Sequence, residues 1–247
     1  MPADANDRQA AQERVAQKRA AQKRTIRDLF TRIAAHYDRV NRLISLGQDG
    51  RWRRRALAAA GVPPDGSILD VATGTGDIAL LARRQFPGSW VVGTDLTPAM
   101  LTQAQCKAGD HILPWVVSDG LALAFADNTF AVVTSGFMMR NVPDIEQAFA
   151  EQARVVRSGG RVVCLEMTWP RRFPMRWLFG LYFFGLSPVV GGAVAGACAP
   201  YRYLPRSVKG FVEPGVLAHT MAQVGLQSVT WKTMMAGTVA IHVGTKP

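Results

Sequence analysis

The sequence predicts an α/β fold built on a seven-stranded, mostly parallel sheet, with helices at the N-terminus and an apolar helical insertion after the fifth strand. Three observations predict this fold. Short apolar segments alternate with helical segments between residues 67 and 167, which is typical of parallel βαβ units with right-handed crossovers. A glycine-rich turn follows the first apolar segment, and two further strand-like segments lie near the C-terminus.

The first sixty residues are predicted to be helical. Residues 6–24 contain no Gly or Pro, but their apolar face is thin, so we expect residues 1–24 to form a basic extension that is mobile or lies on a surface. Apolar side chains at helical spacing predict a packed helix over 26–36. Another helix is expected over 50–60, where Gly61 and a Pro pair follow and end it.

The remaining elements of the predicted sheet follow in order. Strands are expected at 67–71, 90–94, 112–117, 130–135, 161–167, 226–232 and 238–243. Helices are expected at 76–85, 98–107 and 145–156. A turn around Ala236-Gly237 joins the last two strands, which complete the same sheet. Residues 25–247 are therefore predicted to form one domain.

The segment from Trp177 to Tyr201 contains no charged residue and is long enough to cross a bilayer. Six breaks favour two short helices over one span, and these are Gly180, Gly185, Pro188, Gly191, Gly192 and Gly196. A membrane span here would also place the last two strands on the wrong side of the membrane. We expect residues 172–204 to form an apolar insertion over the ligand site that can also touch a membrane surface.

The positive charge is concentrated near the N-terminus. Residues 1–55 hold 14 Lys and Arg and 6 Asp and Glu, a net charge of +8 out of +11 for the whole chain. Such a region can contact an anionic membrane surface or nucleic acid, or it can be a solvated helix. Little aromatic content before Phe30 argues against stacking on bases.

Cysteine usage indicates a reducing compartment. Cys106, Cys164 and Cys198 are widely spaced, so neither a disulfide framework nor a metal site is predicted. The first 25 residues lack an apolar core, which argues against a secretory signal. We expect a cytoplasmic protein.

The strongest local signal is the segment from Ile68 to Asp77, which ends the first predicted strand and opens the following helix. Its small residues let the backbone approach a ligand closely, and in a Rossmann-like fold this crevice binds the ligand. The G-x-G-x-x-G pattern of NAD sites is absent. Asp70 and Asp77 flank the turn, and they would repel a pyrophosphate but suit a cationic sulfonium with an ammonium group. The predicted cofactor is S-adenosylmethionine.

Two further carboxylates follow the second and third strands. Asp95 stands about 20 residues after the glycines, where a carboxylate can accept both ribose hydroxyls. Its alternative role is the N-cap of the next helix. Asp119, followed by Gly120, can bond the adenine amino group, and its alternative role is that of a turn residue.

These segments resemble the ubiquinone/menaquinone biosynthesis C-methyltransferase family, of the demethylmenaquinone methyltransferase type. The resemblance runs from about residue 25 to the end, and its motifs are 30–41, 69–77, Arg140-Asn141-Val142, 201–205 and 236–242. It implies a class I methyltransferase fold and methyl transfer to a ring carbon of a prenylated quinol. Together with the loop, it predicts cofactor contacts from Asp70, Thr73, Gly74, Thr75, Gly76, Asp95, Asp119, Gly120 and Gly136.

The resemblance also suggests the acceptor site. Arg140 would stabilise a developing phenolate, and Asn141 would orient the ring oxygen or a water. A salt bridge between Arg140 and Asp144 is the structural alternative. Three tyrosines are candidates for the ring pocket, with core packing as their alternative role: Tyr37, Tyr201 and Tyr203. His242 is expected to be a core histidine, so a water is left as the base.

Departures from the family pattern leave room for another acceptor, such as a phenolic or amine natural product. The stretch Gly136-Phe-Met-Met-Arg140 stands where the family has Ser-Phe-Gly, and Glu166-Met-Thr168 stands for Glu-Phe-Ser. The Asn/Asp-Pro-Pro-aromatic motif of nucleic-acid methyltransferases is absent at 139–142, so no nucleic-acid substrate is predicted. A non-enzymatic membrane scaffold is a third hypothesis, and a homo-oligomer stays open.

Overall fold

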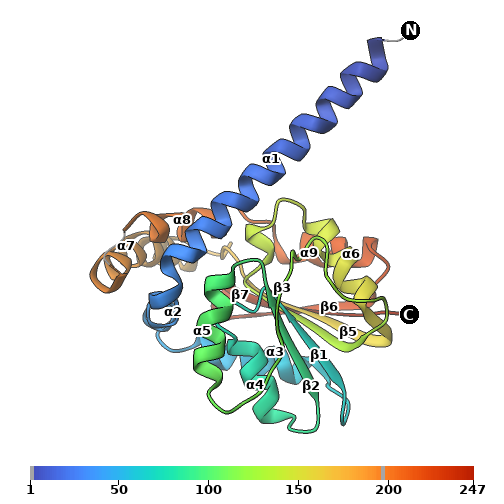
Figure 1. Ribbon diagram of the computed structural model, residues 1–247. Helices are drawn as coiled ribbons and strands as arrows, with labels where there is room; N and C mark the ends of the chain where they lie inside the picture. Colours follow the sequence, from blue (N-terminus) through green and yellow to red (C-terminus); the bar gives the residue numbers. More distant parts are fainter. Residues whose placement is uncertain (1–2, 196–197) are drawn as a thin grey trace.

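One seven-stranded sheet forms the centre of the molecule (Figure 1). The computed structural model describes residues 3–195 and 198–247. The strand order is β3-β2-β1-β4-β5-β7-β6. Strand bounds are β1 (Ser67–Val71), β2 (Trp90–Asp95), β3 (Trp115–Val117), β4 (Phe130–Gly136), β5 (Val156–Met167), β6 (Gln227–Met234) and β7 (Val239–Thr245). Only the pairings of β7 are antiparallel, and the predicted fold class is confirmed.

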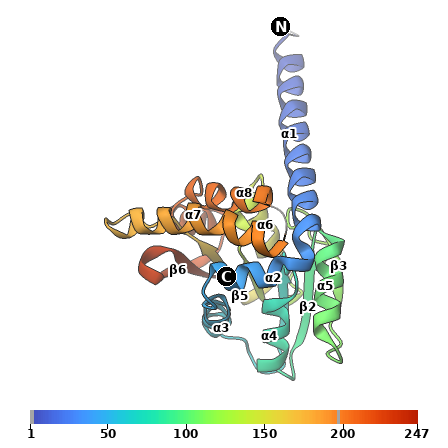
Figure 2. The same cartoon turned by 90° about the vertical axis from the view of Figure 1, so that its left-hand side faces the viewer.

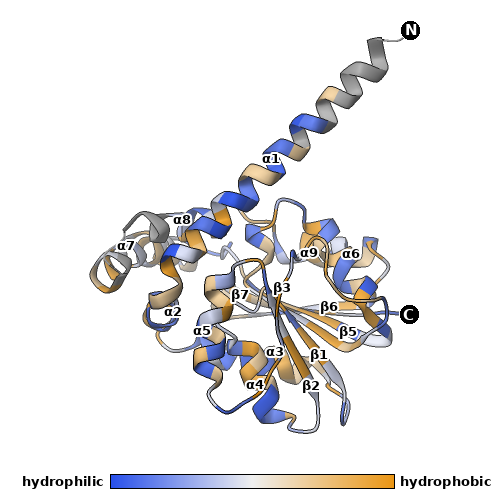
Figure 3. Cartoon of the chain, viewed as in Figure 1, coloured by the Kyte–Doolittle hydropathy of each residue, from blue (hydrophilic) through white to orange (hydrophobic). Residues whose placement is uncertain are grey.

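Helices cover both faces of the sheet because neighbouring residues of each strand point to opposite sides. Ile68 packs in one apolar cluster with α3 (Asp49–Ala60) and α4 (Asp77–Gln85). Leu69 packs in the other with α6 (Ile145–Val155) and α9 (Pro214–Gln223). Helix α5 (Pro98–Ala108) lies near β2 and β3, on the side of α3 and α4 (Figure 1). Figure 3 shows hydrophobic residues concentrated in the central strands of the sheet.

The N-terminal helices differ from the prediction. Helix α1 (Ala3–Ile33) is continuous where two helices were expected, because residues 3–33 contain no Gly or Pro that would break it. A 3-10 turn, η1 (Ala34–His36), and the unpredicted α2 (Tyr37–Ile44) follow. The first turns of α1 project away from the body, and its last turns rest on it (Figure 2).

Two strands have different bounds from those predicted. Strand β3 begins at Trp115 instead of residue 112, and Ile112 is exposed. Strand β5 begins at Val156 instead of residue 161, and its pairing with β4 shifts register between Phe130 and Val132. Gly160 permits this irregularity, because a Cβ there would stand 2.7 Å from the carbonyl oxygen of Ala131.

The apolar insertion forms α7 (Met175–Ala195) and α8 (Cys198–Lys209). The prediction of breaks was wrong within α7, which runs through Gly180, Gly185 and Pro188, while Gly196 lies outside the described residues. Phe183 anchors α7 in a third apolar cluster with residues of α1, α2 and α8. Within the described ranges, this helix is long and apolar enough to cross a membrane by length and composition alone.

Candidate active site

The glycine-rich loop is held in place by Asp95, at the end of β2. The backbone N–H of Gly74 donates to one carboxylate oxygen of Asp95 at 2.9 Å, and that of Thr97 donates to the other at 2.8 Å. Gly74 has φ +57°, which favours glycine. Burial raises the pKa of Asp95, against the two backbone bonds. Asp95 therefore organises the loop and the start of α5, although Thr97 is the N-cap residue, and it also lines the cavity below.

Asp70 lies beneath the loop and does not line the cavity beside it, which is described below. It is 1% exposed, and its two oxygens accept hydrogen bonds from the hydroxyls of Thr73 at 2.6 Å and Thr134 at 2.9 Å. Burial raises its pKa to about 6. Asp70 therefore has a structural role in shaping the loop, and its attraction to a cofactor cation stays a prediction.

Asp77 is also compensated within the protein. It pairs with Arg53 at 3.0 Å and with Lys107 at 2.5 Å. Burial alone would raise the pKa of Asp77, but these two cations hold it below its ordinary value. Lys107 also pairs with Asp38, whose carboxylate accepts the Thr75 hydroxyl. This network ties the cofactor loop to α2, α3 and α5.

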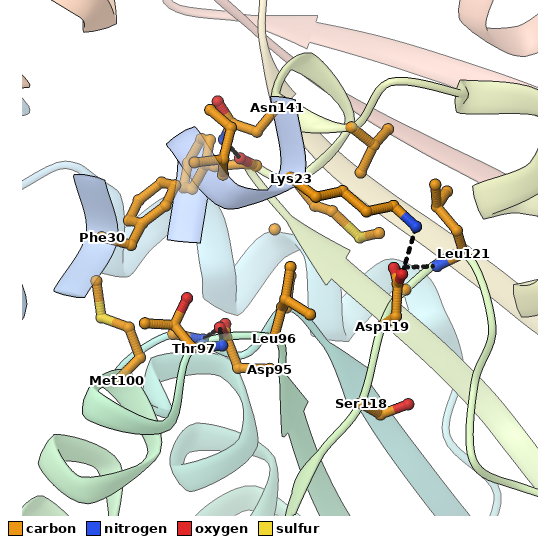
Figure 4. Close-up of a pocket in the computed structure, with 18 of the residues that line it drawn as sticks. Lys23, Phe30, Asp95, Leu96, Thr97, Met100, Ser118, Asp119, Leu121 and Asn141 are labelled. Atoms are coloured by element: carbon orange, nitrogen blue, oxygen red, sulfur yellow. Dashed lines mark hydrogen bonds and ion pairs between the residues drawn. The ribbon is translucent and has the colours of Figure 1, made fainter. Parts of the chain in front are cut away.

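A cavity lies beside the loop at the carboxyl ends of the strands (Figure 4). Its empty volume is about 770 Å³, with its open mouth included. Predicted cofactor residues that line it are Gly74, Asp95, Asp119, Gly120 and Gly136, whereas Thr73, Thr75 and Gly76 support the loop behind it. Within the described part of the chain, no group of three or more His, Cys, Asp or Glu side chains is placed to hold a metal ion.

The last turns of α1 cover this cavity, a contact that sequence patterns did not reveal. Lys23, Ile26 and Phe30 line it, and the Lys23 ammonium pairs with Asp119 at 2.5 Å (Figure 4). The second oxygen of Asp119 accepts the backbone N–H of Leu121 at 2.9 Å. No local signal could find the ion pair, since 96 positions separate its members.

A second, largely apolar cavity adjoins the first, and Tyr37 and Phe137 line both. Its empty volume is about 1400 Å³, with its mouth included. Its apolar walls come mainly from α2, α3 and α7, including Ile44, Trp52, Leu178, Phe179 and Phe183. Its polar residues include Asn41, Arg53 and Arg140, so a lipophilic molecule with one polar end fits this space.

Arg140 is buried at the border of the two cavities. Its side chain is 6% exposed, and its guanidinium pairs with Glu166, which is 0% exposed. The predicted alternative pairing with Asp144 is wrong, because Asp144 caps α6 and pairs with Arg19 at 2.9 Å. The Nε of Arg140 is buried and has no hydrogen-bond partner. The guanidinium lies 5.6 Å from the centroid of the Phe137 ring.

The neighbouring predicted residues are placed differently. The amide of Asn141 donates to the carbonyl of Phe137 at 3.1 Å and its oxygen accepts the Tyr203 hydroxyl at 3.1 Å, so it braces this turn while lining the first cavity. Burial raises the pKa of Tyr37 and of Tyr203, against the nearby Arg140. The side chain of Tyr201 lies outside the described part of the structure. Buried His242 bonds the carbonyl oxygen of Pro214 at 3.0 Å, as a core histidine would.

The sheet order, the carboxylate at the end of β2 and the paired cavities define a class I S-adenosylmethionine-dependent methyltransferase. The chain belongs to the ubiE/COQ5 methyltransferase family, whose model matches residues 17–246. The family, fold and cofactor predicted from the sequence are therefore confirmed.

Individual relatives agree with this assignment. The chain is 43% identical to a demethylmenaquinone methyltransferase of Thermus thermophilus, over 89% of this chain and 100% of the relative. It is 41% identical to a ubiquinone/menaquinone biosynthesis C-methyltransferase of Desulfotalea psychrophila, over 90% of both. Among solved structures, a possible histamine N-methyltransferase of Thermotoga maritima shares the fold, with a TM-score of 0.62 at 15% identity over 90% of this chain and 100% of that one.

Proposed function

We propose that this enzyme methylates a ring carbon of a prenylated quinol, a demethylmenaquinol or a ubiquinone precursor, in quinone biosynthesis. The observation that carries this proposal is the large apolar cavity, which meets the cofactor cavity beside the buried Arg140. A prenyl chain suits its apolar walls, and a ring oxygen suits the cation at its inner end. The names of the relatives from Thermus thermophilus and Desulfotalea psychrophila point to the same class of acceptor.

The cofactor fits the first cavity through the groups already in place there. Asp95 and Asp119 both line this cavity. Asp95 would accept the ribose hydroxyls, and Asp119 would accept the adenine amino group once Lys23 withdraws. Gly120 and Gly136 line the cavity without side chains. A Cβ on Gly120 would collide with Met138, and a Cβ on Gly136 would collide with Ile78. Bound S-adenosylmethionine supplies an activated methyl group on its sulfonium.

The acceptor is activated by charge and placement. A ring carbon becomes nucleophilic when its quinol oxygen carries negative charge, and the guanidinium of Arg140, which lines this cavity, would stabilise that charge. Asn141 holds the turn that bears Arg140, and from the wall of the first cavity it would orient the ring oxygen or a water. Tyr37 lies at the junction of the cavities, where it helps to align the ring with the methyl group. A water accepts the proton that the quinol releases.

We propose a cytoplasmic enzyme that makes peripheral contact with an anionic membrane, where such a quinol resides. Residues 1–24, the N-terminal part of the +8 region, would act as a basic extension of the domain formed by residues 25–247. Each cation near an anionic surface contributes about 1 kcal/mol, screened by salt. The double variant Arg14→Glu/Lys18→Glu reverses two exposed cations of this extension and spares the contacts of Arg19 and Lys23, so it should weaken salt-sensitive vesicle binding while cofactor affinity is retained.

The function is tested by calorimetric titration with S-adenosylmethionine, followed by methyl transfer to a panel of acceptors. We expect methylation of demethylated quinols, with the product mass and the new C–methyl bond identified by mass spectrometry and NMR. Small phenols and amines of similar electron density serve as control acceptors. Transfer to these controls without transfer to any quinol would contradict the proposal.

A further inference from the structure

Helix α7 carries an exposed apolar stripe that the proposed reaction does not explain. One face of the helix is packed, and Phe183 on it is 1% exposed. On the opposite face, exposed apolar side chains recur at helical spacing. Trp177 is 64% exposed, Leu181 is 63% exposed and Val189 is 67% exposed. An apolar stripe of this extent on one helix is typical of a surface that another apolar phase covers.

Cations gather beside this stripe. A cleft at the base of α7 is lined by Arg171, Arg172, Arg176 and Lys209, and Glu213, which pairs with Arg171, is the one carboxylate among its lining residues. The ammonium of Lys209 lies 5.7 Å from the ring centroid of Phe184, which belongs to the exposed face. Apolar side chains bordered by cations match the acyl region and headgroups of an anionic bilayer.

Charge and topology favour a membrane over two other arrangements. A twofold dimer that brings the starts of two α7 helices together would oppose their clusters of cations. A spanning α7 would carry β6 and β7 across the membrane, although β7 pairs with β5, the strand that precedes α7. Tyr182 also ties α7 to α2 through the carbonyl of Ile44, at 2.8 Å.

We infer that α7 lies flat in the surface of an anionic membrane and forms the roof through which the acceptor enters. Met175, Leu178, Phe179 and Tyr182 belong to α7 and line the acceptor cavity. The cavity therefore lies directly beneath the helix on the membrane, and a prenylated molecule reaches it without crossing water. The entry route rests on the proposed function, because it needs a lipophilic acceptor. The docking surface itself rests only on the exposed face of α7 and the cations beside it.

Vesicle binding by the full chain tests the docking surface without any acceptor. Leu181 and Trp177 do not line the acceptor cavity, so Leu181→Glu and Trp177→Glu should leave folding and S-adenosylmethionine affinity unchanged. Each should weaken binding to phosphatidylcholine vesicles that contain phosphatidylglycerol by at least about tenfold. Arg172→Glu/Arg176→Glu should remove the preference for these vesicles over phosphatidylcholine alone. Ile112→Glu, at an exposed apolar residue in the loop after α5, is the matched control and should bind like the wild type.

Three results would overturn the inference. Wild-type vesicle binding by Leu181→Glu would assign the contact to α1, which these variants leave intact. Resistance of membrane-bound protein to carbonate extraction would show a spanning helix. A dimer in sedimentation velocity that Leu181→Glu dissociates would show that a second copy covers the stripe. Turnover of a short-chain, water-soluble quinol tests the proposed function separately, and it should be equal in Leu181→Glu and the wild type.

Discussion

The cofactor half and the acceptor half of this site are built by different means. The cofactor half stands on the carboxyl ends of β1, β2 and β4, where Asp70 and Asp95 hold a single loop through hydrogen bonds at 2.6–2.9 Å. The acceptor half is enclosed by helices from both ends of the chain and has one buried ion pair at its inner end. Local geometry thus fixes the first half, and long-range packing fixes the second.

This difference teaches where each half is vulnerable. In the cofactor half, changes at Asp95 or Asp119, which line the cavity, should act on affinity, whereas a change at the buried Asp70 beneath the loop should act on stability. The acceptor half depends on the buried pair of Arg140 and Glu166, so changes there should act on turnover and on stability together. Substitutions in the two halves should therefore separate losses of affinity from losses of turnover and stability.

The largest effect is expected at the buried ion pair. Arg140→Met leaves Glu166 buried and unpaired, which should cost about 3–5 kcal/mol of unfolding free energy. The double variant Arg140→Met/Glu166→Gln removes both charges and should recover most of that stability. Its turnover should stay about 10²–10³ below the wild type, because a preorganised donor to the developing phenolate is missing.

Three measurements on the same samples test this separation: urea unfolding, calorimetric titration with S-adenosylmethionine, and turnover. Cofactor affinity should change less than a few-fold in the double variant. Recovery of turnover along with stability would show that the pair serves the fold alone. Arg140→Lys should regain part of the rate, since an ammonium cannot reproduce the planar fork of donors.

The next effect concerns Asp70 and pH. Its pKa is raised by burial from 3.8 to about 6, so the folded state binds this proton more tightly than the unfolded chain. The unfolding free energy should therefore fall as pH rises from about 4 to about 6 and should level off above that. The loss amounts to roughly 3 kcal/mol, at 1.36 kcal/mol per pKa unit. Asp70→Asn should lack this dependence, and equal pH profiles of the two proteins would contradict the assignment.

A smaller effect is expected at Asp95, in the cofactor half. Hydrogen bonds to a charged group contribute about 1.5–3 kcal/mol each, so Asp95→Ala should weaken binding of S-adenosylmethionine at least tenfold while the sheet stays folded. Asp110→Ala, at an exposed carboxylate after α5, is the control. Unchanged affinity in folded Asp95→Ala protein would remove Asp95 from the cofactor site.

The two halves also differed in how far the sequence predicted them. Strand β1 and the turn at Gly74 were found because a strand and its loop are encoded by adjacent residues. Glu166 was noted only as the matching first residue of a family motif whose next two residues differ here, and not as the partner of Arg140. A carboxylate directly after the apolar run 162–165 was the available signal, yet its partner depends on which strand lies alongside.

Helix α7 also shows that long-range packing limits what the sequence predicts. Glycine and proline weaken an isolated helix, which is why breaks were predicted. Packing of Phe183 against α1, α2 and α8 supplies a stabilisation that local propensity does not contain. The contacts with α1 and α2 join segments more than a hundred residues apart, and no local pattern encodes them.

The smallest effect is expected at Lys23 on α1, which lines the cofactor cavity. Its ion pair occupies the Asp119 oxygen that the adenine amino group would use, so the pair must open before that bond can form. Lys23→Met removes the competitor. A partly exposed ion pair contributes about 0.2–1 kcal/mol, so affinity for S-adenosylmethionine should rise by up to about fivefold. Salt screens such a pair, and raising the salt concentration should bring the wild type toward the variant.

Arg19→Met is the matched control for Lys23→Met, because Arg19 ties the same helix to Asp144 without touching Asp119. Loosening α1 in this way leaves the ion pair between Lys23 and Asp119 in place, so Arg19→Met should not reproduce the gain in affinity for S-adenosylmethionine. Equal gains in both variants would mean that the cover itself hinders the cofactor, whichever contact holds it. Weaker binding in Lys23→Met would instead place Lys23 among the groups that retain the cofactor, and α1 would then be part of the cofactor half of the site.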